Sequence, residues 1–429
     1  MIELDDTHDP ARTSWLASAN TPDCDFPLQN LPFGRFMLPQ DHAPRLGVAI
    51  GDCVLDLAVL GHDAPADMTE LLTASAASRR TLRALLCRAL TQGSPRQGQY
   101  RAALYPLNRV RLLLPCAIEN YTDFYAGIHH ARAVGSLFRP DAPLLPNYHW
   151  VPIAYHGRAS SLLPSGSPVK RPLGQVKHAA EDSPQLRPTA KLDFELEVGI
   201  IIGRPNDLGS PIPIDEAASH IFGLTLLNDW SARDIQAWEY QPLGPFLAKN
   251  FATTLSPWIV TLEALAPFHA PLARPEEAPT LPYLDHDEDR RHGAFEIALE
   301  VSLSTARMRQ AGETPARITS SHFARAAYWS AAQMVAHHTI NGCNLRPGDL
   351  LGSGTLSGPT RDQAGSLIEL TEGGKTAITL PNGEARRFLE DGDQVIFTGK
   401  ATKDGFRSIG FGACVGEILP CPQYALPRD

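Results

Sequence analysis

The sequence predicts a mainly β protein of the α+β class, with a small β-rich N-terminal domain and a large β-rich C-terminal domain. The longest apolar runs, such as RLLLPCAI (111–118) and LEVGIIIG (196–203), have the length of strands. The 37 prolines and 33 glycines among the 429 residues are spread without a period, which favours short strands joined by tight turns. Aromatic, histidine, arginine and acidic residues crowd into short segments after Pro115, as expected when loops on a rigid sheet carry a site.

The N-terminal part contains strand and helix signals but little chemistry. Residues 1–24 are polar and irregular, and we expect a loosely held tail there. The segments RLGVAIG (45–51) and CVLDLAVL (53–60) flank a Gly51-Asp52 turn and predict a hairpin. Leucines at helical spacing predict a helix over 68–92. We therefore place an N-terminal domain at 25–116 and a C-terminal domain at 117–429.

Composition excludes several classes of protein. The net charge of −9 gives no electrostatic footprint for nucleic acid or an anionic membrane, and no apolar run approaches the ~20 residues that span a bilayer. The start, MIELDDTHDP, has neither the basic nor the apolar part of a secretory signal. The seven cysteines form no CxxC pair, which excludes zinc-ribbon and redox motifs. We expect a cytoplasmic protein with reduced thiols.

The segment NYTDFYAGIHHARAVGSLFRP (120–140) brings five chemically useful side chains together. They are Asp123, Tyr125, His129, His130 and Arg139. If 124–137 is helical, Asp123 lies at the N-terminal edge, where a carboxylate suits the helix dipole as well as it suits a metal ion. One of the two histidines is a candidate general base, and the sequence does not choose between them.

The segment KLDFELEVGIII (191–202) predicts a strand that becomes fully buried. On a strand, Asp193, Glu195 and Glu197 point to the same face. Buried like charges are costly unless a cation neutralises them, which favours a metal site. The alternative is a solvated sheet face that ends where the apolar run begins.

The segment 221–254 carries a strand and then a helix. GLTLLND predicts a buried strand that ends at Asp229, and Ser231-x-x-Asp234 predicts a capping box that opens the helix. Asp229 at the strand end is a candidate metal ligand, although a plain ion pair with an arginine is the alternative.

The helix after Asp229 presents a polar face. Arg233, Gln236 and Tyr240 are spaced i, i+3, i+7 and share that face, with Lys249 and Thr253 further along the chain. The alternative is an ordinary amphipathic helix that leaves Arg233 in solvent.

A glycine-rich loop and a following apolar segment complete the candidate site. GSGTLSG (352–358) matches no phosphate-binding pattern, and we expect a tight loop that brings the Thr355 hydroxyl close to a ligand. Glu369 lies in the segment GSLIEL (365–370), which predicts an apolar strand. Such surroundings raise the pKa of a carboxyl group, whereas a paired glutamate on an edge strand is the alternative.

Together these residues predict a binding site for a hard cation. Four carboxylates without cysteine (Asp123, Glu195, Glu197 and Asp229) favour Ca²⁺ or Mg²⁺. A candidate histidine base and a cluster of Lys, Arg and Gln donors suit negative charge that develops on oxygen. The pattern indicates metal-assisted chemistry on a polyoxygenated acid. It does not separate bond cleavage from hydration or decarboxylation.

Seven segments together resemble the fumarylacetoacetate hydrolase family, over nearly the whole chain from Asp25 onward. They are DFPLQNLPFG (25–34), RLGVAIG (45–51), YTDFY (121–125), YHGRASS (155–161), LDFELE (192–197), NDWSARDIQAWEYQPLGPF (228–246) and NGCNLRPGDLLGSGTLSGP (341–359). The resemblance implies a homodimer with an N-terminal SH3-like barrel and a large C-terminal mixed β-roll domain. It also implies hydrolytic C–C cleavage of 4-fumarylacetoacetate, a diketo-dicarboxylate, to fumarate and acetoacetate in tyrosine and phenylalanine catabolism.

The resemblance also implies a role for each matching residue. Asp123, Glu195, Glu197 and Asp229 would bind Ca²⁺, and Asp229, Lys249 and Thr253 would hold Mg²⁺, with Lys249 giving its backbone carbonyl rather than its ammonium group. The catalytic residues would be His130, oriented by Glu369, with Arg233, Gln236 and Lys249 as donors. The substrate contacts would be Tyr125, Arg139, Gln236, Tyr240 and Thr355.

Two alternatives to this reaction stay open. One is another metal-dependent activity of the wider superfamily, such as an acylpyruvate hydrolase or a decarboxylase. The other is a catalytically silent metal-binding protein of the same fold.

Overall fold

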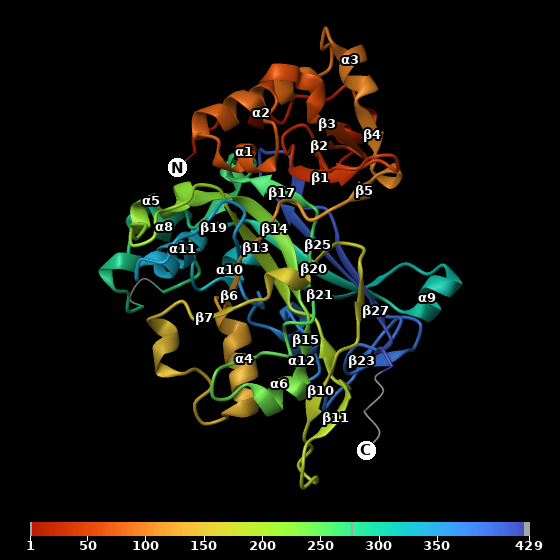
Figure 1. Cartoon of the computed structure of the whole chain (residues 1–429), viewed down its shortest axis with the longest axis vertical. Coiled ribbons are helices and arrows are strands. Elements are labelled where there is room, and N and C mark those ends of the chain that lie inside the picture. The colour runs from red at the N-terminus through yellow and green to blue at the C-terminus, as the bar shows by residue number, and fades with distance from the viewer. Residues whose placement is uncertain (1, 276–277, 424–429) are drawn as a thin grey trace.

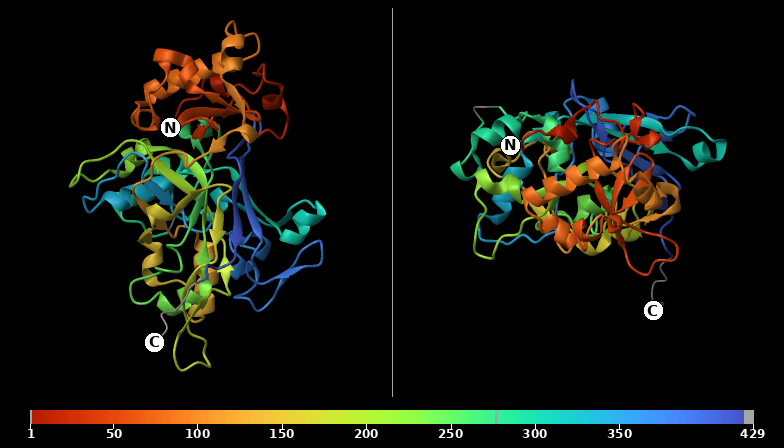
Figure 2. Two further views of the ribbon diagram at one scale, coloured as in Figure 1. Left: turned by 45° about the vertical axis from the view of Figure 1, so that its right-hand side comes forward. Right: turned by 90° about the horizontal axis from the view of Figure 1, so that it is seen from above.

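The computed structural model describes residues 2–275 and 278–423, and these contain more strand than helix, as the sequence predicts. The N-terminal segment forms a lobe at one end of the molecule, and the hairpin of β10 (Leu173–Val176) and β11 (Gln185–Pro188) reaches the opposite end (Figures 1 and 2). Among the described residues, no helix has both the length and the apolar character needed to cross a bilayer.

The N-terminal lobe is a small antiparallel meander with helices on its outer side (Figure 1). The predicted hairpin around Gly51 is confirmed, and Gly51 adopts a φ of 59°, in the left-handed region that favours glycine. The predicted helix over 68–92 is two helices, because the Ser75 hydroxyl accepts a hydrogen bond from the Ser78 amide and starts a second helix there. The elements are β1 (Phe33–Met37), β2 (Arg45–Ile50), β3 (Cys53–Asp56), α1 (Met68–Thr73), α2 (Ala76–Leu90), α3 (Gln97–Ala102), β4 (Leu104–Pro106) and β5 (Arg111–Leu112).

The expectation of a loose tail before Asp25 is wrong. The His8 ring is buried, with Nε2 2.8 Å from the Glu263 carbonyl, and the Trp15 indole donates to the Ala89 carbonyl at 3.0 Å. Hydrogen bonds from the His8 and Trp15 rings to backbone carbonyls thus hold this polar segment against the rest of the protein.

One continuous sheet joins the lobe to the rest of the chain. Its main path is β4-β3-β2-β1-β17-β14-β13-β22-β6-β7, and β1 meets β17 with Phe33 opposite Ile259. No strand pairing recorded among the described residues closes the N-terminal strands into a barrel. The further strands are β6 (Tyr121–Phe124), β7 (Ala154–His156), β8 (Leu162–Pro164), β13 (Leu196–Ile202), β14 (Ile221–Asp229), β16 (Thr253–Leu255), β17 (Trp258–Thr261) and β22 (Leu350–Gly352).

A second sheet packs on the first across a large buried core. Its order is β21-β20-β25-β27-β9, and the core between the sheets includes Leu226 of β14 and Phe397 of β25. The Phe397 ring lies edge-on to that of Phe194, which precedes β13. The strands are β9 (Pro168–Lys170), β20 (Ile297–Ser304), β21 (Ala316–His322), β25 (Gln394–Ala401), β26 (Ile409–Gly410) and β27 (Cys414–Leu419).

Short helices and two-stranded ribbons complete the fold. The helices are α4 (Ile128–Phe138), α5 (Ile214–Ala217), α6 (Arg233–Glu239), α7 (Leu262–Leu265), α8 (Asp287–His292), α9 (Ala306–Ala311), α10 (Phe323–Ala326), α11 (Ala331–Thr339) and α12 (Leu367–Leu370). The ribbon strands are β10 (Leu173–Val176), β11 (Gln185–Pro188), β12 (Leu192–Asp193), β15 (Ser231–Ala232), β18 (His269–Ala270), β19 (Ala294–Phe295), β23 (Ile378–Thr379) and β24 (Ala385–Arg386).

Three predicted elements differ near the chemically rich segments. The predicted helix over 124–137 begins only at Ile128, so Asp123 lies within strand β6 instead of capping a helix. The predicted strand over 191–202 is interrupted between Asp193 and Leu196. The predicted strand over 365–370 is wrong, since Leu367–Leu370 form the short helix α12. Four residues are too few to show a helical period in the sequence.

Candidate active site

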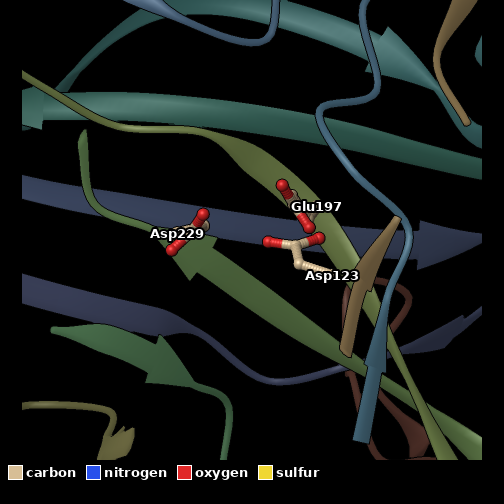
Figure 3. A group of neighbouring side chains, drawn as sticks. All are labelled: Asp123, Glu197 and Asp229. Atoms are coloured by element: carbon tan, nitrogen blue, oxygen red, sulfur yellow. The ribbon is translucent and has the colours of Figure 1, made fainter. Parts of the chain in front are cut away.

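Three carboxyl groups from three neighbouring strands point toward one another (Figure 3). Asp123 comes from β6, Glu197 from β13 and Asp229 from the end of β14. One oxygen of each lies within 4.8 Å of the others. We call these three residues the carboxylate trio.

Sheet topology brings the trio together. Strand β22 lies between β13 and β6, and Gly352 of β22 pairs with both Gly199 and Asp123. A side chain at position 352 would place its Cβ 2.5 Å from Asp123 Oδ1 and 3.0 Å from Glu197 Oε2. The glycine therefore leaves the space in which the two carboxyl groups meet.

Two members of the trio, Asp123 and Glu197, form no ion pair with another described residue, whereas Asp229 does. Asp123 Oδ1 and Glu197 Oε1 are buried without a hydrogen-bond partner. Burial and the neighbouring carboxylate of Asp229 raise the pKa of Asp123 well above its usual value, and burial and Asp123 do the same to the pKa of Glu197. Orphaned buried oxygens of several carboxyl groups fit a hard divalent cation.

Two tyrosines that the sequence did not assign hold the trio from outside. The Tyr121 phenol donates to Asp123 Oδ2 at 2.7 Å, and the Tyr155 phenol donates to Asp229 Oδ2 at 2.7 Å. A Cβ at Gly157 would lie 2.1 Å from the Tyr121 ring, so this glycine admits the tyrosine. The signal was the segment YHGRASS, which carries Tyr155 and Gly157.

Glu195, the fourth predicted metal ligand, lies among cations rather than in the trio. Its Oε2 lies 2.5 Å from Lys249 Nζ, and its Oε1 lies 2.8 Å from Arg233 Nη1 and 3.8 Å from His130 Nε2. Burial by itself raises the pKa of Glu195, but Lys249, Arg233 and His130 together hold it well below its usual range. Asp193, Glu195 and Glu197 thus take three different environments instead of one sheet face.

The ammonium group of Lys249 links Glu195 to Asp229 of the trio. Nζ lies 2.6 Å from Asp229 Oδ2, opposite Glu195. Burial lowers the pKa of Lys249, but Asp229 and Glu195 outweigh it and the net shift is upward, so the group is charged. The Thr253 hydroxyl donates to Asp229 Oδ1 at 3.1 Å, which places both residues predicted for a second cation at Asp229.

His130 forms a dyad with Glu369. Its Nδ1 lies 2.6 Å from Glu369 Oε2, which also accepts from the hydroxyls of Ser357 and Ser366. Burial raises the pKa of Glu369, but His130 and these hydrogen bonds outweigh it, so the net shift is downward. The expected upward shift is therefore wrong, because the apolar sequence around Glu369 did not show its hydrogen-bond donors. His129 is half-buried, and burial lowers its pKa.

Helix α6 presents the predicted polar face. Arg233 is buried, and its Nη1 donates to Gln236 Oε1 at 3.1 Å. The exposed Trp238 and buried Arg233 exclude the ordinary amphipathic helix. The predicted capping box is wrong, because Ser231 donates to the Asp229 carbonyl and Asp234 accepts from the Thr189 hydroxyl.

The predicted substrate contacts take different positions around this centre. The Tyr125 ring lies edge-on to His130, with 5.5 Å between ring centroids. Thr355 Oγ1 and Arg139 Nε are buried and have no hydrogen-bond partner among the described residues. Tyr240 directly follows α6 as its C-cap residue and is half-buried.

Two family models match successive parts of the chain. The model described as "Fumarylacetoacetase N-terminal" matches residues 29–115, and the one described as "Fumarylacetoacetate (FAA) hydrolase C-terminal" matches residues 119–418. The chain is 45% identical to the fumarylacetoacetase of Arabidopsis thaliana over 419 residues, which cover 93% of this chain and 97% of that one. It is 44% identical to the fumarylacetoacetase of Homo sapiens over 417 residues, which cover 93% and 97%.

A solved structure, that of Cg1458 with inhibitor, shares the fold. Its TM-score is 0.51 at 16% sequence identity, and the match covers 91% of this chain and 100% of that one. High identity over nearly the whole length and two matching family models agree with the resemblance of the motifs. This chain therefore belongs to the fumarylacetoacetase family of hydrolases.

Proposed function

We propose that the chain hydrolyses 4-fumarylacetoacetate to fumarate and acetoacetate, with water activated by His130. The observation that carries this proposal is the position of the His130–Glu369 dyad. Its imidazole Nε2 lies 3.8 Å from Glu195, which the Lys249 ammonium links to Asp229 of the carboxylate trio. A base, a set of donors and a cation site thus meet in one buried centre.

The trio is the proposed site of a divalent cation, with Ca²⁺ as the first candidate. Asp123, Glu197 and Asp229 would hold it, with Glu195 as a possible fourth ligand if Lys249 releases it. Mg²⁺ is proposed near Asp229, Lys249 and Thr253. Held there, the cation would be chelated by the two oxygens of a 1,3-diketone and would supply Lewis-acid polarisation of the carbonyl that water attacks.

Glu369 fixes the tautomer of His130, the proposed base. Because its carboxylate accepts from Nδ1, the imidazole proton lies on Nδ1 and the Nε2 lone pair is free to take a proton from water. The hydroxide oxygen adds to the carbonyl carbon, and the bond to the acetoacetate carbon then breaks. The imidazolium Nε2 returns the proton to the departing carbon, so atoms and charge balance.

Three donors would stabilise charge on the substrate oxygens. Arg233 Nη2 is buried and has no partner, and Gln236 and Lys249 lie beside the same carboxylate network. Such preorganised donors favour the tetrahedral oxyanion and the acetoacetate enolate. Arg139, Tyr125, Tyr240 and Thr355 are the proposed contacts for the carboxylate ends and the remaining oxygens of the substrate.

The test follows the loss of the substrate's enol absorbance and identifies both products. We expect turnover that EDTA abolishes and a divalent cation restores. His130→Ala should lower kcat by about 10²- to 10⁴-fold, the usual contribution of a general base. His129→Ala is the matched control and should keep activity, since among the described residues it is His130, not His129, whose imidazole is hydrogen-bonded to Glu369.

Other results would replace the proposal. An enzyme that leaves fumarylacetoacetate intact but cleaves a short acylpyruvate is a different hydrolase of the superfamily. A protein that binds the cation but turns over neither substrate is a silent member of the fold. Equal loss in both histidine variants would contradict the role of His130.

Assembly and finer architecture belong to the same proposal. We propose a homodimer, an SH3-like N-terminal barrel to about residue 116 and a C-terminal β-roll, and a cytoplasmic location. The support is the identity to fumarylacetoacetases over nearly the whole chain. Sedimentation of the purified chain tests the dimer.

A further inference from the structure

Asp193 is a fully buried carboxylate that no role above uses. It ends β12, which pairs with β15 so that Asp193 lies opposite Ser231, two residues before Arg233. Its side chain therefore reaches the start of α6 on one side. On its other side it reaches α12, which lies 174 residues further along the chain.

Asp193 accepts four hydrogen bonds. Oδ1 accepts from the amides of Leu367 at 2.7 Å and Phe194 at 2.9 Å, and Oδ2 accepts from the Ile368 amide at 3.0 Å and Arg233 Nε at 2.9 Å. A carboxylate offers about four such acceptor positions, so all are filled.

Helix α12 depends on this external cap. It has only four residues, which is far too short to be stable by itself. Its N-cap residue, Ser366, gives its hydroxyl to Glu369 and makes no capping hydrogen bond. The free amides of Leu367 and Ile368 at the helix start are instead satisfied by Asp193, and the next residue of the same helix is Glu369, the partner of His130.

The other side of Asp193 holds the donor group. Arg233 Nε is bound to Asp193 and Nη1 is bound to Glu195 and Gln236, which leaves the buried Nη2 without a partner. The planar guanidinium has fixed donor directions, so binding at Nε sets the orientation of the whole group.

We propose that Asp193 is a positioning residue that fixes the base dyad relative to the donor cluster, holding Glu369 through α12 and Arg233 through Nε. It touches neither the trio nor the reacting atoms. The proposal rests on the function proposed above, and it predicts loss of kcat without loss of cation or substrate binding.

The test is Asp193→Asn, which keeps the shape of the side chain. The asparagine oxygen offers only two acceptor positions, and its NH₂ group would face N–H donors that now bind the carboxylate. We expect kcat to fall by about 10²-fold, as misplacement of a catalytic group does. KM and the Ca²⁺ Kd should stay within about threefold of the wild-type values, because Asp193 contacts neither the substrate nor the cation site in this proposal. The matched control is Asp393→Asn, an equally buried carboxylate bound by Arg386 and the Glu390 amide, which should keep kcat.

Two further readouts separate positioning from general destabilisation. In a Glu369→Gln background, Asp193→Asn should cost less than about tenfold, because two residues that act through one path are not additive. Hydrogen exchange of the peptide spanning 366–372 should rise in Asp193→Asn and stay unchanged in Asp393→Asn. This exchange needs no substrate, so it decides the positioning role even if the chain does not cleave fumarylacetoacetate.

Unchanged kcat and exchange in a folded Asp193→Asn would overturn the proposal, and so would full additivity with Glu369→Gln. If Asp193→Asn does not fold, Asp193→Ser takes its place, since a water can fill the smaller site. Unfolding of both variants would also overturn it, because the carboxylate would then be a requirement of the fold rather than a positioning group.

Discussion

Two pairs of carboxyl groups in this centre are buried alike and behave in opposite ways. The side chains of Glu195 and Glu369 are 8% and 6% exposed, and the residues Asp123 and Glu197 are 2% and 0% exposed. Cationic neighbours and hydrogen bonds overcome burial and lower the pKa of Glu195 and of Glu369, whereas burial and like charges raise the pKa of Asp123 and of Glu197.

Because these four carboxyl groups are all buried, their neighbours account for the opposite directions of their pKa shifts. Where the chain supplies lysine, arginine or histidine, the carboxylate acts as a structural or orienting anion. Where it supplies none, the deficit must be met by protons or by a cation from solution. The four predictions below test that division.

The largest effect should come from removing one member of the trio. Glu197→Gln should weaken Ca²⁺ binding by more than about 10²-fold, beyond what the loss of an outer-shell partner costs. At pH 8 the same change should raise the melting temperature of the cation-free protein, since it replaces a buried carboxyl group whose ionisation is destabilising. Calorimetric titration and thermal melts measure the two effects, with Glu119→Gln on the surface as control. A cation-free variant that melts below the wild type would contradict the interpretation.

Replacing Lys249 should instead lower the stability of the cation-free protein. Lys249→Met leaves Glu195 and Asp229 without their shared cation, and removing one partner of a buried pair costs about 3–5 kcal/mol. Urea unfolding of the cation-free protein measures the loss. Added Ca²⁺ should recover part of it, because Asp229 then gains another partner. Stability equal to that of the wild type would mean that this carboxylate pair does not depend on Lys249.

A smaller effect is expected from the phenol that orients Asp229. Tyr155→Phe removes a hydroxyl that lies 2.7 Å from Asp229 Oδ2 and 3.3 Å from Asp123 Oδ2. A hydrogen bond to a buried carboxylate contributes about 1.5–3 kcal/mol. Part of this loss should appear as weaker Ca²⁺ binding, while KM for substrate stays unchanged. Tyr105→Phe in the N-terminal lobe is the matched control. An unchanged Ca²⁺ Kd would limit the role of Tyr155 to packing.

The smallest effect is a pH dependence of the cation-free protein. The pKa values of Asp123 and Glu197 are raised in the fold above the usual value of about 4, so their contribution to stability is complete below that value and is lost as pH rises through the raised values. The gap in melting temperature between cation-loaded and cation-free protein should therefore widen from pH 5 to pH 8. A constant gap would mean that the trio does not hold protons without the cation.

Helical period made part of the site predictable. Arg233 and Gln236 share a face of α6 because i and i+3 positions always do, and the two residues are hydrogen-bonded as expected. The end of a buried strand likewise placed Asp229 correctly. These are local properties, which a sequence carries in its spacing.

Nonlocal contacts were not predictable in this way. The choice of His130 over His129 and the pKa direction of Glu369 depend on a contact across 239 residues. Asp193 looked equivalent to Glu195 and Glu197 on a strand, and the break before Leu196 separated their environments.

The sequence by itself determined the chemical inventory, the mainly β character and the family, because residue types, short-range periods and motifs are written in it directly. Only the tertiary structure decided which carboxylates meet cations and which are left for an external ion. That decision depends on strand order, above all on β22 lying beside β6 so that Gly352 meets Asp123, and burial in a shared centre then lets neighbours set each charge.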